Sequence, residues 1–392
     1  MTTEMNNLIE ERNNLCKYSY LIKKETDKRN KDKRKQGADW KNLTYMNIFA
    51  LPSHIKILFG PFMKTPLYTE IGILRGHTYA VMCLTLHKNK LYSGSCDKTI
   101  RIWAEGTNTE THEEIGILRG HTENVFCLTI HENKLYSGSA DNTIRIWNTE
   151  THEEIATLRG HTDTVWCLAL HENKMYSGSC DNTIRIWNTE THEEIATLRG
   201  HTDTVWCLAL HENKLYSGSC DNTIRIWNTE THEEIAILRG HTDVVRCLTS
   251  HENKLYSGGY DNTIRIWAGT NTETYEEIAT LRGHTYAVSC LTIHENKLYS
   301  GSQDGTIRIW NTETHEEICI LRGHTSIVRC LALHENKMYS GSTDKTIRSW
   351  NTETHEEIAI LRGHTDVVRC LTLHENKLYS GSYDNTIRIW KV

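Results

Sequence analysis

Apolar and polar positions group into short runs separated by turn-type residues. In residues 151–190 these runs are EEIATL (153–158), VWCLAL (165–170), KMYSGS (174–179) and TIRIW (183–187). The turn residues between them, such as His-Glu-Asn and Asp-Asn, bound short strands rather than helices. The run at 165–170 is apolar nearly throughout, which predicts a strand buried on both faces. The pattern therefore predicts four strands within one 40-residue segment.

This segment recurs eight times, each copy marked by Leu-Arg-Gly-His. Its histidines are His77, His121, His161, His201, His241, His284, His324 and His364. They lie 40 residues apart except for gaps of 44 and 43, and both insertions follow a Trp, which marks a loop there. Residues 151–190 and 191–230 differ at a single position, so the copies include recent duplicates and their differences are more informative than their identity. Four short strands repeated eight times predict an all-β, eight-bladed β-propeller with four antiparallel strands per blade.

The two ends of the repeat region predict how the ring closes. The last run, TIRIW at 386–390, is the third strand of its set, while TEIGIL at 69–74 precedes the first complete set. We expect this N-terminal strand to complete the last blade, which removes an open sheet edge. The propeller then spans 68–392. Residues 1–67 hold all three prolines and 13 Lys and Arg against 7 Asp and Glu, and we expect a basic, partly helical segment outside the propeller.

Each repeat resembles the WD-repeat family through its Gly-His, strand Ser, turn Asp and terminal Trp. The resemblance covers residues 68–392, although Asn, Ala or Lys follows the Trp where the family has Asp. It implies a hydrogen-bonded tetrad inside every blade. The first, a middle and the last set are His77, Ser93, Asp97 and Trp103; His201, Ser217, Asp221 and Trp227; and His364, Ser380, Asp384 and Trp390.

Ser, His and Asp are also the residue types of a hydrolytic triad. A catalyst needs one triad with a cleft and an oxyanion hole, whereas eight equivalent sets beside a Trp favour a structural role, because such a network satisfies buried polar groups. We therefore expect no enzyme activity, no catalytic residue and no cofactor. Cys96, Cys180 and Cys220 precede the turn Asp, but no Cys-x-x-Cys pair accompanies them, so we expect no metal site.

Charge and cysteine content narrow the classes of partner. Residues 1–67 have a net charge of +6 and the remainder −12, from 31 basic and 43 acidic residues. An acidic ring argues against general nucleic-acid binding, and neither a signal peptide nor an apolar run of membrane length predicts a membrane partner. Eight cysteines share one strand position a blade apart and cannot pair, which predicts a reducing compartment, the cytoplasm or nucleus. They are Cys83, Cys127, Cys167, Cys207, Cys247, Cys290, Cys330 and Cys370.

Differences between copies concentrate on the face that carries the Gly-His loops and the Asp turns, while His-Glu-Asn-Lys and Asn-Thr-Glu-Thr on the opposite face hardly change. Five residues after the His the copies read Met82, Phe126, Trp166, Trp206, Arg246, Ser289, Arg329 and Arg369. Before the turn Asp they read Cys96, Ala140, Cys180, Cys220, Tyr260, Gln303, Thr343 and Tyr383. Neutral divergence is the alternative, but it has no reason to gather aromatics on consecutive blades.

Aromatic residues and Arg are enriched at binding hot spots, and the Arg fork matches phosphate. We therefore predict a peptide-binding surface at the mouth of the central channel. Its residues are Phe126, Trp166, Trp206, Arg246, Tyr260, Arg329, Arg369 and Tyr383.

This surface resembles that of the F-box/WD-repeat substrate receptors of ubiquitin ligases, which also have eight blades and place arginines at this strand position. The resemblance implies that Arg329 and Arg369 clamp a phosphate beside Tyr383, with Arg246 and Tyr260 as a second pair. Thr343 stands where the family has a further Arg. NNLCKYSY (13–20) and ADWKNLTYMN (38–47) are similar to the stretch after an F-box, although no complete F-box precedes them.

Two functions follow from these patterns. One is a receptor that binds phosphorylated peptides and joins them to a ligase through an adaptor protein. The other is a scaffold that assembles a multiprotein complex without any connection to ubiquitin.

Overall fold

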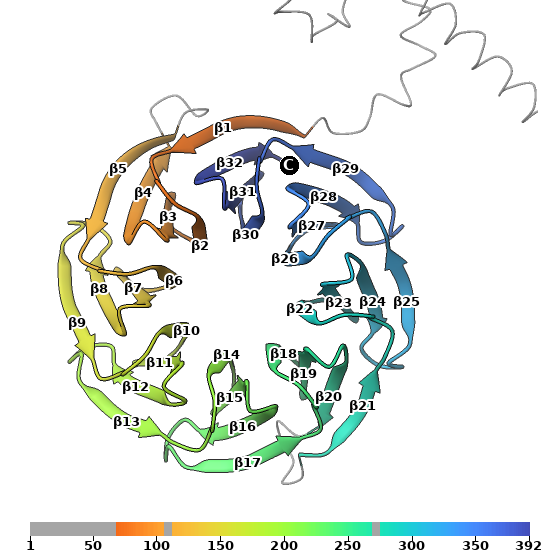
Figure 1. Cartoon of the computed structure of the whole chain (residues 1–392), viewed down its shortest axis with the longest axis horizontal. Coiled ribbons are helices and arrows are strands. Elements are labelled where there is room, and N and C mark those ends of the chain that lie inside the picture. Colours follow the sequence, from red (N-terminus) through yellow and green to blue (C-terminus); the bar gives the residue numbers. More distant parts are fainter. Residues whose placement is uncertain (1–67, 106–111, 269–274) are drawn as a thin grey trace, which may run out of the picture. The chain divides into compact units, whose positions relative to one another are not determined.

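The computed structural model describes residues 68–105, 112–268 and 275–392, and these residues form eight four-stranded sheets arranged as blades of a ring (Figure 1). Every strand pairs antiparallel with its neighbour. The predicted eight-bladed, all-β propeller is thus confirmed. The expectations for residues 1–67 lie outside the described residues.

The blades are numbered from β2 onward, so that blade 1 contains β2–β5 and blade 8 contains β30–β32 with β1. The innermost strands are β2 (Val81–His87), β6 (Val125–His131), β10 (Val165–His171), β14 (Val205–His211), β18 (Val245–His251), β22 (Val288–His294), β26 (Val328–His334) and β30 (Val368–His374). The second strands are β3 (Lys90–Ser95), β7 (Lys134–Ser139), β11 (Lys174–Ser179), β15 (Lys214–Ser219), β19 (Lys254–Gly259), β23 (Lys297–Ser302), β27 (Lys337–Ser342) and β31 (Lys377–Ser382).

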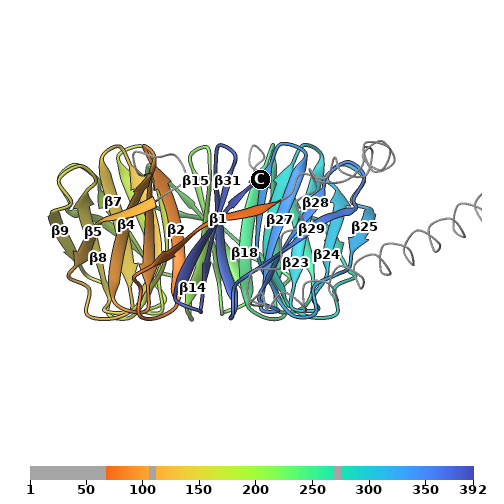
Figure 2. The ribbon, with the colours of Figure 1, turned by 90° about the horizontal axis from the view of Figure 1, so that it is seen from above.

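The third strands are β4 (Thr99–Glu105), β8 (Thr143–Asn148), β12 (Ile184–Asn188), β16 (Thr223–Asn228), β20 (Ile264–Ala268), β24 (Ile307–Asn311), β28 (Thr346–Asn351) and β32 (Thr386–Lys391). The outermost strands are β5 (His112–Arg119), β9 (Glu154–Arg159), β13 (Glu194–Leu198), β17 (Glu234–Arg239), β21 (Glu277–Leu281), β25 (Glu317–Leu321), β29 (Glu357–Arg362) and β1 (Thr69–Arg75). Figure 2 shows the ring edge-on, with the turns gathered on two opposite faces.

The hydrophobic core lies between neighbouring blades rather than inside one sheet. One cluster, for example, joins Tyr136 and Ile146 of blade 2 to Val165, Met175 and Trp187 of blade 3, all of them buried. An equivalent cluster fills each of the other blade boundaries. Each blade therefore needs its neighbours to bury its apolar residues, as in other repeat architectures.

The innermost strands are less buried than their composition predicts. In β10 only Val165 is buried and the six residues after it are partly exposed, whereas in β11 every residue after Lys174 is buried. The expectation of an innermost strand buried on both faces is wrong, because this strand lies next to the ring axis and the second strand occupies the middle of the blade (Figure 1).

A glycine in the second strand permits the close approach of two blades. A Cβ on Gly178 would lie 2.7 Å from Cys167 Sγ of its own blade and 2.8 Å from Val205 Cγ1 of the next. The equivalent glycine of every other blade is equally confined, so Gly is required there for packing.

Strand β1 closes the ring from the N-terminal side of the described region. It pairs antiparallel with β32, in a register that runs from Thr69 opposite Lys391 to Arg75 opposite Thr386. Blade 8 therefore combines strands more than 300 residues apart, ordered β1-β32-β31-β30. The predicted closure by residues 69–74 is confirmed.

On the face of the His-Glu-Asn-Lys turns, here called the repeated face, a Lys in each of blades 1–7 contacts the next blade. Lys134 Nζ donates to Thr189 O at 2.6 Å and lies 3.3 Å from His192 Nε2. Burial and the nearby ammonium lower the pKa of the His192 side chain. The same shift affects His152, His232, His315 and His355.

Two blade boundaries replace this histidine with tyrosine. Lys214 Nζ lies 5.1 Å from the centroid of the Tyr275 ring, and Lys337 Nζ lies 5.5 Å from that of Tyr68. A cation over an aromatic face is favourable, so the lysine keeps an attractive contact at these two boundaries as well.

Candidate binding face

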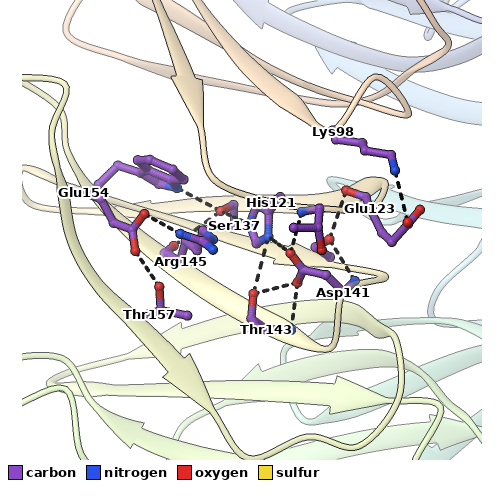
Figure 3. Close-up of polar contacts among 12 residues, drawn as sticks. Lys98, His121, Glu123, Ser137, Asp141, Thr143, Arg145, Glu154 and Thr157 are labelled. Carbon is purple, nitrogen blue, oxygen red and sulfur yellow. Dashed lines mark hydrogen bonds and ion pairs between the residues drawn. The ribbon is translucent and has the colours of Figure 1, made fainter.

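The four tetrad residues of each blade form one connected hydrogen-bond network. In blade 2 (Figure 3), His121 Nδ1 lies 2.8 Å from Asp141 Oδ2, His121 Nε2 lies 2.8 Å from Ser137 Oγ, and Trp147 Nε1 donates to Ser137 Oγ at 2.9 Å. Thr143 Oγ1 donates to the second carboxylate oxygen, Asp141 Oδ1, at 2.6 Å. The structure brings together all three tetrads named in the sequence analysis in the same way.

The environment keeps the tetrad aspartates ionised. Burial by itself raises the pKa of the Asp141 carboxyl, but hydrogen bonds from His121, Thr143 and the Thr122 backbone N–H outweigh it and hold the pKa well below its usual range. The other seven turn aspartates are shifted in the same direction by the same contacts. A charged carboxylate accepts stronger hydrogen bonds than a neutral one, and the shift therefore stabilises the blade.

The tetrad contains the Ser–His–Asp contacts of a hydrolytic triad, but its serine is not accessible to a substrate. Ser217 is fully buried, and its Oγ already receives the N–H of Trp227 while facing His201 Nε2. A substrate carbonyl has no approach to that oxygen, because the indole occupies the open side. The eight networks are therefore structural parts of the blades.

The residue five positions after each Gly-His histidine is the extra residue of a β-bulge. In blade 3 the register shifts between Val165 and Cys167, which leaves Trp166 without a partner residue on β11. All eight innermost strands shift at this position. Bulges re-aim a side chain and are frequent near functional sites, and here the re-aimed position is among the most variable between blades.

On blades 2–5 the side chains at these bulges form a continuous stack, here called the aromatic ladder. The rings of Phe126 and Trp166 are stacked with centroids 4.2 Å apart, and those of Trp166 and Trp206 lie 4.4 Å apart. The guanidinium of Arg246 lies 4.6 Å from the Trp206 ring centroid. Each such contact contributes about 0.5–1.5 kcal/mol. The side chains hold one another in place, so they form one continuous apolar surface before a ligand binds.

Both indole N–H groups of the ladder are already bonded. Trp166 Nε1 donates to Cys180 Sγ at 2.8 Å and Trp206 Nε1 donates to Cys220 Sγ at 2.6 Å. The cysteines before the turn Asp therefore fix the tryptophan orientation, a role that the sequence analysis did not assign. The ladder consequently offers apolar ring edges to a ligand.

Blades 7 and 8 carry the second group of predicted binding residues. Burial and the positive charge of Arg369 lower the pKa of the Arg329 guanidinium, while the hydroxyls of Tyr383 and Tyr260 act in the opposite direction. Arg329 Nε donates to Thr343 Oγ1 at 3.3 Å, and Tyr260 and Tyr383 are both 38% exposed. The structure thus brings the predicted arginine and tyrosine pairs within electrostatic reach of one another, while Arg246 also forms the end of the ladder over Trp206.

The structure repeats in every blade a set of ion pairs that was not predicted from the sequence. In every blade an Arg of the third strand forms an ion pair with a Glu of the outermost strand. The pairs are Arg101–Glu114, Arg145–Glu154, Arg185–Glu194, Arg225–Glu234, Arg265–Glu277, Arg308–Glu317, Arg348–Glu357 and Arg388–Glu70. The constant Arg of Thr-Ile-Arg and the constant second Glu of His-Glu-Glu were the available signal.

The described residues contain neither a cluster of metal-ligating side chains nor a membrane-spanning helix. Within 68–105, 112–268 and 275–392, no group of three or more His, Cys, Asp or Glu side chains is placed to hold a metal ion. The same residues contain no helix that is long and apolar enough to span a membrane.

Comparisons with known proteins agree with this architecture. The family described as "WD domain, G-beta repeat" matches eight segments, 68–104, 112–148, 152–188, 192–228, 232–268, 275–311, 315–351 and 355–391. Among solved structures, the crystal structure of the computationally designed Ika8 protein is similar, with 31% identity and a TM-score of 0.76. That match covers 82% of this chain and 99% of the designed protein. A comparison with curated proteins found no match. The eight family matches, one to each blade, show that this chain belongs to the WD-repeat family, whose propellers are protein-interaction modules.

Proposed function

We propose that the face of the Gly-His loops and Asp turns, here called the variable face, binds phosphorylated peptides of a partner protein. The supporting observation is a contrast between two sets of arginines. The eight third-strand arginines each pair with a glutamate. In the described part of the chain, Arg246, Arg329 and Arg369 on the bulges have no carboxylate partner.

A phosphate supplies what this arginine group lacks. A phosphoserine or phosphothreonine brings close to two negative charges and three acceptor oxygens. Arg329 and Arg369 lie on neighbouring blades and bind it from two sides, at roughly 1.5–3 kcal/mol for each charged hydrogen bond. The aromatic ladder then receives an apolar flank of the same extended peptide along its ring edges.

A peptide-binding experiment tests the arginine clamp. Paired synthetic peptides with and without phosphate are titrated against the parent protein and the double variant Arg329→Ala/Arg369→Ala. We expect the variant to lose the preference for phosphate by more than about tenfold, since about 1.4 kcal/mol corresponds to tenfold in Kd. It should also show a weaker salt dependence.

Two control variants separate the clamp from general effects. Arg322→Ala/Arg362→Ala removes two exposed arginines at the ends of the outermost strands β25 and β29, Arg322 just after β25 and Arg362 as the last residue of β29. This variant should keep most of the phosphate preference. Trp166→Ala/Trp206→Ala should weaken phosphorylated and unphosphorylated peptides alike. If the first double variant binds phosphopeptides as well as the parent does, the clamp is misplaced and a scaffold function becomes the better interpretation.

We further propose that the bound partner is presented to a ubiquitin ligase. Support comes from the position of Arg329 and Arg369 and from the Leu15-Cys16 stretch, which lies outside the described residues. Affinity purification of the full chain from cells tests this role. Co-purification of an F-box adaptor supports it, and a stable complex without that adaptor supports the scaffold.

A further inference from the structure

The loop residue two positions after each Gly-His histidine differs between the blades of the variable face. Blades 2–5 carry the acids Glu123, Asp163, Asp203 and Asp243 there, and blade 8 carries Asp366. Blades 1, 6 and 7 carry Tyr79, Tyr286 and Ser326. Tyr79 and Tyr286 are 64% and 63% exposed, so this position faces solvent. Four of the five acids lie on blades 2–5, the blades of the aromatic ladder.

Three of these acids have no cationic partner. Glu123 pairs with Lys98 Nζ at 3.0 Å. In the described part of the chain, the remaining three bond only to the next backbone N–H, as Asp163 Oδ1 does with Thr164 N at 2.6 Å. One carboxylate oxygen is held by the loop and the second carries charge toward solvent. Blades 3–5 thus present three carboxylates without a cationic partner beside the ladder, against the one guanidinium of Arg246.

The loops do not require these acids in order to fold. In blade 1, which has Tyr79, Ser95 Oγ donates to the Tyr79 carbonyl at 2.9 Å and Cys96 N donates to Ala80 O at 2.9 Å. The same bonds in blade 3 join Ser179 Oγ to Asp163 O at 3.0 Å and Cys180 N to Thr164 O at 2.9 Å. The loop geometry is equal with and without the carboxylate, so a cap alone does not account for three acids in succession.

On blades 7 and 8 the side chains at the bulges are positive. Arg329 and Arg369 stand on blades 7 and 8 without a carboxylate partner among the described residues, and Asp366 is the acid of the equivalent loops there. Complementary charge fixes the register and excludes wrong partners more than it adds affinity. An extended peptide across this face therefore meets positive charge at one end and negative charge beside apolar rings at the other.

We propose that the variable face selects a bipolar peptide, with its phosphate over blades 7 and 8 and a Lys or Arg next to an apolar residue over blades 3–5. This inference rests on the proposed function and adds the polarity of the ligand. Asp163, Asp203 and Asp243 are then specificity residues for the basic end. The aromatic ladder receives the apolar neighbour of that basic residue.

The test uses a panel of synthetic phosphothreonine peptides of about 15 residues, a length that spans about 50 Å when extended. Each carries one Lys-Leu or one Glu-Leu pair at increasing separations on either side of the phosphate. The parent protein should bind the best Lys-Leu peptide about fivefold to tenfold more tightly than its Glu-Leu counterpart, as expected for several exposed charge contacts of modest strength.

The triple variant Asp163→Asn/Asp203→Asn/Asp243→Asn keeps the capping oxygen of each loop and removes the charge. It should lose the preference for Lys over Glu while keeping the preference for phosphate. Asp366→Asn, at the same loop position in blade 8, is the matched control and should keep both preferences. Thermal melting should be unchanged for both variants, because the loops keep their backbone bonds.

The outcomes separate the two proposals. If the parent shows no preference for phosphate, the proposed function is wrong. If it prefers phosphate but binds Lys-Leu and Glu-Leu peptides within twofold at every separation, the polarity is wrong and the clamp stands. Equal Lys preference in the parent and the triple asparagine variant also overturns the assignment of the three aspartates.

Discussion

The two faces of the propeller differ in what their side chains hold together. On the repeated face, Lys134 bonds to the next blade, and Asn188 Oδ1 caps its own loop by accepting the N–H groups of Glu190 and Thr191. On the variable face, the ladder side chains contact one another and the exposed aspartates contact only their own loops. Sequence identity between blades therefore coincides with contacts that recur in every blade or at most blade boundaries, whereas the divergent ladder residues contact one another only across blades 2–5.

Both faces depend on the tetrads, and the largest expected effect comes from breaking one of them. Asp221→Ala leaves His201, Thr202 N–H and Thr223 without their common acceptor. We expect a loss of about 1–3 kcal/mol in the free energy of unfolding, measured by chemical denaturation. Asp203→Ala removes an exposed aspartate in the preceding loop and should change it by less than about 0.5 kcal/mol. Equal effects would mean that the tetrad does not stabilise the blade.

A smaller loss is expected at one boundary of the repeated face. Lys174→Met keeps the aliphatic stem and removes the bond from Nζ to Thr229 O, which measures 2.6 Å. The free energy of unfolding should fall by about 0.5–1.5 kcal/mol. Because the Lys174 charge lowers the pKa of His232, an NMR titration should also show that pKa rising toward 6.5. Lys345→Met, an exposed turn residue of the variable face, should leave both quantities unchanged.

As the pH falls, the contacts of the repeated face should lose their contribution to stability before the tetrads do. The five boundary histidines have pKa values below 6.5 in the folded protein, so the unfolded chain binds more protons near that pH. The stability that they contribute is present above pH 6.5 and is lost as the pH falls toward their folded pKa values. The tetrad aspartates also have lowered pKa values, and their contribution is lost only in more acidic solution, below the usual pKa of 3.8.

Melting temperature measured against pH tests this order. Replacing the five histidines with Tyr, as at Tyr68 and Tyr275, should flatten the part of the profile just below pH 6.5. The tetrads should be unaffected, so the decline at lower pH should remain. A profile that stays equally steep in the Tyr variant would show that these histidines do not cause it.

The smallest effect on stability is expected for the arginine clamp. Arg329→Ala/Arg369→Ala should change the free energy of unfolding by less than about 0.5 kcal/mol per site, because Arg329 makes one side-chain hydrogen bond and Arg369 has no carboxylate partner in the described region. Denaturation of the same sample used for peptide binding checks this. A large loss would place the arginines among the structural contacts and remove their support for a binding role.

Repetition made the fold predictable in detail. Eight Gly-His signals at nearly constant spacing gave the number of blades, and TEIGIL ahead of the first set gave the closing strand. The tetrads followed from the family resemblance, and their geometry is confirmed. The burial of the innermost strand was not predictable from its apolar run, because proximity to the ring axis is a property of the assembled ring rather than of one strand.

The candidate site was only partly predictable. The residue types at the bulges could be read from the sequence, but the contact of Arg246 with Trp206 depends on side-chain directions across two blades. The bonds from Trp166 and Trp206 to cysteine sulfurs could not be predicted either, since each cysteine lies 14 residues further along the chain, in the turn after the second strand. The sequence shows where the exposed aspartates are, but whether a cationic side chain lies near them could be known only from the structure.

Because β1 pairs with β32, the last blade cannot be completed until the end of the described region has been synthesised. The two strands are separated by more than 300 residues, so β1 leaves the ribosome long before its partner has been made. At about 5–20 residues per second, the delay is roughly 15–60 s. During that interval β1 and the face of blade 1 that packs against blade 8 lack their final neighbours. The nascent chain therefore exposes apolar surface to which a chaperone can bind.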